Sequence, residues 1–60
     1  MVIEIRFDGP NVMVRRFGAD AIGRWSVVTP GQVDRVCTGL AYEDLRRLGE
    51  GLWELPAKAG

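Results

Sequence analysis

The chain has 60 residues, 47% of them hydrophobic and 27% charged, and its eight basic residues balance eight acidic ones. This length supports one small domain, residues 1–60, with a thin core; the composition is too apolar for a disordered chain and lacks the long apolar run of a membrane span. Because its net charge is zero, the chain lacks the surplus of positive charge that a generic nucleic-acid binder carries.

Two strands joined by a tight turn are predicted at the start of the chain. Residues 2–7 alternate apolar and charged side chains at the period of two that is typical of a half-buried strand. Residues 8–11 are all turn formers and residues 12–17 resume a β-type composition, so we expect an antiparallel hairpin. Aromatic and β-branched residues at 24–29 predict a third strand.

Residues 30–38 fit either a strand or a short helix. Apolar residues that begin at Val33 recur at i+3, i+4 and i+7, as on one face of a helix, and Pro30 suits a first helical position. Pro30 and Gly31 also fit a type II turn, and the β-branched run 33–37 has the length of a strand. We favour a fourth strand.

A helix is predicted near the end of the chain, from about Tyr42 to Pro56. Four leucines recur there at intervals of three, four and three residues, which places them on one stripe of a helix. Because Gly49 and Gly51 each cost roughly 1 kcal/mol relative to alanine, packing of this stripe on the sheet must hold the helix. The stripe consists of Leu45, Leu48, Leu52 and Leu55. The expected fold class is α+β, an antiparallel meander of three to four short strands followed by one C-terminal helix packed on one sheet face.

One edge of the predicted helix is the first candidate binding surface. Tyr42, Arg46 and Trp53 lie along this edge, beside the leucine stripe, with Gly49 between the two rings. Aromatic residues and arginine are enriched in interface hot spots, so we expect this edge to bind a protein partner. The alternative is that both rings cover the rim of a small core.

The opposite face of the predicted helix is acidic. Glu43, Glu50 and Glu54 would lie on it and form a second candidate partner-binding surface, which would meet a basic protein. The alternative is an ordinary solvated face, since surface charge alone contributes little energy.

Arginines on the predicted strands suggest a different function. Three arginines and a tryptophan fall on neighbouring strands, where they could hold a phosphate backbone and stack a base. These residues are Arg15, Arg16, Arg24 and Trp25. With no net positive charge, we expect nucleic acid to bind weakly at most. A third possibility is a structural subunit that forms an oligomer.

Residue types needed for catalysis and metal binding are missing. The chain has no histidine and only one cysteine, one serine and one lysine. It therefore lacks the residues that usually combine a catalytic nucleophile with a general base. A zinc site needs about four cysteine or histidine ligands. We therefore expect no enzymatic activity, metal or other cofactor. The lone Cys37 and a start without secretory features predict a reducing, cytoplasmic location away from membranes.

The chain is very short, has no net charge and no catalytic residues, and is rich in arginine, glycine and valine. In these features it resembles small phage-encoded inhibitors, in particular anti-CRISPR proteins. The resemblance is one of kind and contains no shared motif, so no functional residue is carried over. It implies an inhibitor without chemistry of its own that occupies a surface of a Cas effector subunit. Members of this family that mimic DNA are acidic, whereas this chain has no net negative charge. We therefore expect it to block a protein surface directly rather than to mimic DNA.

Overall fold

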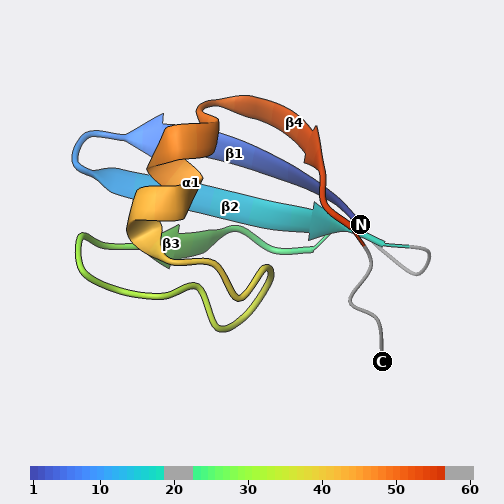
Figure 1. The fold of residues 1–60 in the computed structure, drawn as a ribbon, viewed down its shortest axis with the longest axis horizontal. Helices are drawn as coiled ribbons and strands as arrows, with labels where there is room; N and C mark the ends of the chain where they lie inside the picture. The colour runs from blue at the N-terminus through green and yellow to red at the C-terminus, as the bar shows by residue number, and fades with distance from the viewer. Residues whose placement is uncertain (19–22, 57–60) are drawn as a thin grey trace.

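The alternating segments of the sequence form one antiparallel sheet, and a helix crosses one of its faces (Figure 1). The structure, a computed structural model, describes residues 1–18 and 23–56. Within these residues the elements are β1 (Val2–Asp8), β2 (Asn11–Phe17), β3 (Ser26–Val28), α1 (Tyr42–Leu48) and β4 (Gly51–Glu54). The strand order is β3-β2-β1-β4, and all neighbouring strands are antiparallel. The predicted α+β class, with a meander sheet, is confirmed.

The predicted hairpin forms the centre of the sheet. β1 and β2 pair along their whole length, and Ile5 lies opposite Val14. Gly9 in the connecting turn has a φ of 59°, a conformation that glycine adopts without steric cost. Because side chains alternate between the two faces of a strand, Ile3, Ile5, Val12 and Val14 all point to the same face, where they are buried.

β3 confirms the third predicted strand in a shorter form. Of the predicted segment 24–29, only Ser26–Val28 pairs with β2. Arg24 and Trp25 therefore lie in the connection before the strand. Val28 is buried, so this short edge strand still contributes to the core.

The strand expected at residues 33–37 is wrong, and so is the alternative of a short helix. Val33 makes an isolated β-bridge with Ala41, and the residues after Asp34 form a turn. The buried Asp34 carboxylate causes this turn, because it accepts hydrogen bonds from three successive backbone N–H groups at 2.9 to 3.1 Å and from the Thr38 hydroxyl at 2.7 Å. An acidic side chain that binds nearby N–H groups offers the backbone an alternative to both a helix and a strand.

The Asp34 carboxyl makes stability depend on pH. Burial raises its pKa, but the hydrogen bonds from Cys37, Thr38 and Val36 together outweigh burial and leave the pKa below its usual value. Since the folded-state pKa is lowered, the stabilisation is fully present above the unfolded-state pKa of about 3.9 and is lost as pH falls through the folded-state value.

Asp34→Asn should lower the free energy of unfolding by about 2 kcal/mol at neutral pH, because an amide oxygen cannot accept all four hydrogen bonds. The difference from wild type should shrink as the pH falls below about 4. Urea denaturation at a series of pH values measures both effects. A variant as stable as wild type at neutral pH would contradict this role of Asp34.

The helix is shorter than predicted and ends at Leu48 rather than at Pro56. Gly49 and Gly51 have φ values of 92° and 132°, a region that favours glycine, so the chain leaves the helix and turns back there. The segment that follows is β4, which pairs with β1. The fourth strand thus comes after the helix, and the helix is not the last element.

The core lies between α1 and the sheet face that it covers (Figure 1). Of the predicted leucine stripe, Leu45 is fully buried, and Leu48 and Leu55 pack partly against the core. Leu52 is 64% exposed because it lies on β4 opposite Glu4, on the other face of the sheet. The buried apolar residues are Ile3, Ile5, Val12, Val14, Val28 and Leu45.

Two leucine variants distinguish this fold from one with a longer helix. Leu45→Ala should lower the free energy of unfolding by about 2 to 5 kcal/mol, since it leaves a cavity in the core. Leu52→Ala, at an exposed position, should change it by less than about 0.5 kcal/mol. Urea denaturation of both variants checks this, and equal losses would support the longer helix instead.

Candidate protein-binding surfaces

An arginine stacked on two aromatic rings forms the first candidate surface, on the face of the sheet that α1 crosses. The guanidinium carbon of Arg46 lies 4.2 Å from the centre of the Phe7 ring and 5.9 Å from that of the Tyr42 ring. Tyr42 and Arg46 are one helical turn apart, as predicted, and the Tyr42 hydroxyl donates a hydrogen bond to the carbonyl of Pro10. Phe7 was not predicted as a site residue and comes from β1. We call Phe7, Tyr42 and Arg46 the stacked corner.

Trp53 lies apart from the stacked corner, so the predicted helix edge is divided. It stands on β4 opposite Ile3, because the helix ends before it. Its indole N–H donates a hydrogen bond to the carbonyl of Gly49 at 2.8 Å, and its ring packs against the core. Ile3 is four residues along β1 from Phe7, about 13 Å. The ring of Trp53 therefore covers the rim of the core at the other end of the sheet.

The three glutamates predicted to share a helix face lie on separate elements. Glu43 is in the first turn of α1, Glu50 follows the helix, and Glu54 ends β4. The Glu50 carboxylate accepts a hydrogen bond from the backbone N–H of Phe7 at 2.9 Å, so it attaches the end of the helix to β1. The predicted continuous acidic face is wrong, because α1 ends at Leu48.

The predicted arginine set is also divided. Arg15 and Arg16 are neighbours on β2, so their side chains point to opposite faces of the sheet. Arg15 points away from the helix, and its guanidinium carbon lies 4.6 Å from the centre of the Trp25 ring and 5.0 Å from that of Phe17. Arg24 is exposed in the connection before β3.

Arg15 is paired with an acidic residue within the sheet. Its guanidinium forms an ion pair with Glu4 at 2.6 Å, and Arg6 lies 3.3 Å from the same carboxylate. The hydrogen bond from Arg15 lowers the pKa of the Glu4 carboxyl, against the opposing effect of desolvation. Because Arg15 is already paired with Glu4, its charge attracts a phosphate backbone less strongly, while the three groups together keep one positive charge since Arg6 shares the same carboxylate.

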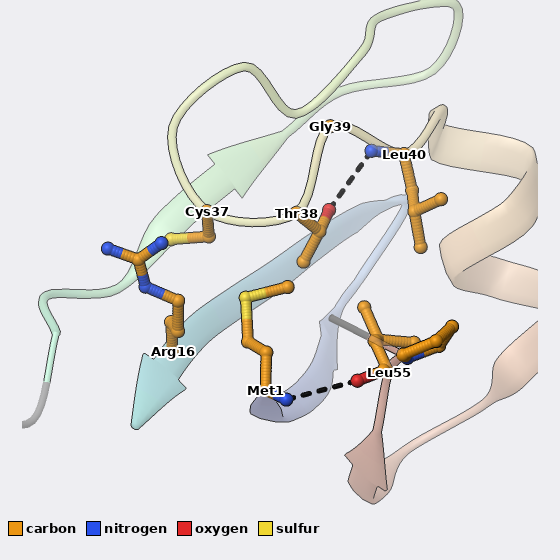
Figure 2. A pocket seen from close by; sticks show the side chains of 8 residues that line it. Met1, Arg16, Cys37, Thr38, Gly39, Leu40 and Leu55 are labelled. Atoms are coloured by element: carbon orange, nitrogen blue, oxygen red, sulfur yellow. Dashed lines mark hydrogen bonds between the residues drawn. The ribbon is translucent and has the colours of Figure 1, made fainter. Parts of the chain in front are cut away.

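A groove of about 620 Å³ lies where β2 ends, between the turn after Asp34 and the segment after β4 (Figure 2). Arg16 and Cys37 line one part of it, and Leu40 and Leu55 line another. The Cys37 sulfur lies 3.5 Å from the Ser26 hydroxyl oxygen. Its lining residues include no carboxylate side chain, and two other groups with nucleophilic atoms are already hydrogen-bonded: the Thr38 hydroxyl donates to Asp34, and the Met1 amino group donates to the Leu55 carbonyl. The groove therefore offers shape rather than acid–base chemistry.

The part of the chain that the structure describes contains neither a cluster of metal ligands nor a membrane-spanning helix. In residues 1–18 and 23–56, no three histidine, cysteine, aspartate or glutamate side chains gather as metal ligands would. Nor does that part of the chain contain a helix long and apolar enough to cross a membrane. No protein-family model, curated protein or solved structure matches the chain.

The division of the arginines predicts weak binding of nucleic acid at most. Fluorescence polarisation with single-stranded DNA should show no binding near micromolar concentration at about 150 mM salt. Micromolar binding of single-stranded DNA would contradict this expectation if it were lost both at higher salt and in the double variant Arg15→Ala with Arg16→Ala.

Proposed function

We propose that the chain is a non-enzymatic protein-binding module whose contact centre is the stacked corner, Phe7, Tyr42 and Arg46. The observation that carries the proposal is the position of the Arg46 guanidinium, 4.2 Å from the centre of the Phe7 ring and 5.9 Å from that of the Tyr42 ring. Arginine and tyrosine are among the residue types that contribute most energy at protein interfaces. Two of the three residues predicted for the helix edge therefore remain together.

The stacked corner is ordered before a partner arrives. Arg46 is exposed, yet two rings hold its guanidinium, and the Tyr42 hydroxyl is bound to the Pro10 carbonyl. Immobilising a flexible side chain costs about 0.5 to 1.5 kcal/mol on binding. The fold already restricts the rotamers of the Arg46 side chain. Much of this entropic cost is therefore not incurred when a partner binds.

The charge of Arg46 specifies the chemistry of the partner. Among the described residues, no carboxylate lies within ion-pair distance of its guanidinium. Glu50, which is one helical turn ahead in the sequence, binds the N–H of Phe7 instead. A partner that presents a carboxylate beside an apolar surface would pair with the N–H groups of Arg46 while covering both rings.

The resemblance to anti-CRISPR proteins supports a Cas effector subunit as the first partner to test, with the chain acting as an inhibitor that covers its surface. The single cysteine supports a reducing, cytoplasmic setting for this activity. Arg15 and Arg16 point to opposite faces of the sheet, and Arg15 is paired with Glu4, so protein is favoured over nucleic acid as the partner.

Three variants test the stacked corner against purified Cas effector subunits, and against any protein retained by the tagged chain from host lysate. Arg46→Ala should weaken binding by at least about 2 kcal/mol, as loss of a hot spot does. Arg46→Lys should also weaken it, since lysine keeps the charge but not the planar stack. Arg47→Ala is the matched control, because Arg47 is the adjacent helix arginine and pairs with Asp44 at 3.3 Å.

Urea denaturation of each variant separates binding from folding. A folded Arg46→Ala variant that keeps wild-type affinity for the retained protein would contradict the proposal. Equal losses in Arg46→Ala and Arg47→Ala would also contradict it, because they would indicate general attraction by positive charge.

A further inference from the structure

The groove at the end of β2 exists because α1 covers only part of its sheet face. α1 has seven residues, a length of about 10 Å, and it lies towards the β1–β2 turn, where Arg46 stacks on Phe7. The other end of the same face, near Met1, is bordered by the turn after Asp34 and the segment after β4 (Figure 2). The groove between them measures about 620 Å³. This volume is within the range of roughly 300 to 1,000 Å³ that is typical of small-molecule sites.

The middle of the groove is apolar. Leu40 and Leu55 line it, and both are half-buried and pack partly against the core. The same two leucines line an adjoining hollow of about 270 Å³ that reaches Leu48 at the end of α1. The charged side chains that border this hollow, Asp44 and Arg47, pair with each other at 3.3 Å. An apolar chain can therefore extend from the groove into the hollow.

A positive charge stands at the β2 side of the groove. Among the described residues that line it, Arg16 is the one with a charged side chain. Arg16 lies opposite Ile3, so it points to the sheet face that α1 partly covers. In residues 1–18 and 23–56, no carboxylate lies within ion-pair distance of its guanidinium. The groove thus combines apolar walls with a charge that selects a negatively charged ligand.

Backbone hydrogen-bond donors along the groove are already occupied. The N–H groups of residues 37–40 are bonded within the turn that Asp34 forms, and the Leu55 N–H donates to the Met1 carbonyl. A peptide in the groove would find few free N–H groups for its carbonyls, and unpaired carbonyls lower affinity. The Arg16 guanidinium, in contrast, has five N–H donors. This distribution favours a ligand whose polar atoms are concentrated in one anionic group.

We propose that the groove binds a small carboxylic acid with an apolar tail, such as a medium-chain fatty acid anion. The carboxylate accepts hydrogen bonds from the Arg16 guanidinium, and the tail lies along Leu40 and Leu55 towards Leu48. This goes beyond the proposed function, because the groove and the stacked corner lie at opposite ends of the sheet and share no residue.

Decanoate, decanol and decylammonium are matched probes of the groove, because they have the same tail length and differ in charge. In NMR titrations of the whole chain, decanoate below its micelle concentration should bind with a dissociation constant of about 0.1 to 1 mM and shift the amide signals of Leu40 and Leu55. The other two probes should bind at least about tenfold more weakly, since neither pairs with Arg16. Decanoate should also slow alkylation by iodoacetamide of Cys37, which lines the groove.

Variants of Arg16 test which residue holds the carboxylate. Arg16→Gln should weaken decanoate binding at least about tenfold and leave decanol binding unchanged. Arg16→Glu should reverse the preference, so that decylammonium binds more tightly than decanoate. Arg6→Gln is the matched control, because it removes the same charge from an exposed arginine on the opposite face of the sheet. Circular dichroism confirms that each variant is folded.

Three results would overturn parts of this proposal. Absence of saturable decanoate binding to the wild-type chain, or equal binding of decanoate and decanol, would overturn the site itself. Equal weakening by Arg16→Gln and Arg6→Gln would overturn the role of Arg16, because it would indicate general attraction by positive charge. Tighter binding of acetyl-trileucine, a peptide with the same charge as decanoate, would overturn the choice of ligand class.

Discussion

Pairing of β4 with β1 determines where every surface of this protein lies. The Met1 amino group donates a hydrogen bond to the Leu55 carbonyl at 3.0 Å, and the Leu55 N–H donates to the Met1 carbonyl at 2.7 Å. The same pairing places Trp53 beside Ile3 and Leu52 on the face opposite α1. Because β1 then has a neighbour on each side, it is a central strand. Its side chains point alternately to the sheet face that α1 covers and to the opposite face.

The hairpin could be predicted from the sequence because its signals are local, namely period-two alternation and a cluster of turn residues at 8–11. The end of the helix could not be predicted in this way. The leucines keep a helical spacing as far as Leu55, and β4 has four residues, too few for an alternation to be distinguished. Gly49 and Gly51 mark the end of the helix in the structure, but in the sequence the cost of two glycines is equally compatible with a longer helix held by packing.

Part of the candidate site also followed from local spacing. Tyr42 and Arg46 are four residues apart on a helix whose start was predicted correctly, so their proximity was expected. Phe7 could not be selected, because its contact depends on how α1 crosses the sheet. The separation of Arg15 from Arg16 was available from the sequence, since adjacent residues on one strand point to opposite faces.

The β1–β4 pairing also shields β1 from other chains. Its hydrogen-bonded ends are 54 residues apart, so closing this part of the sheet costs more chain entropy than closing the hairpin. If β4 detaches, β1 becomes an edge strand whose segment 2–7 contains three β-branched residues, alternates apolar with charged side chains and is free of glycine and proline. Such a segment can add further strands from identical chains, as in cross-β fibrils. While β4 is paired, it covers this edge of β1, and its removal would expose backbone N–H and C=O groups with which another chain could pair.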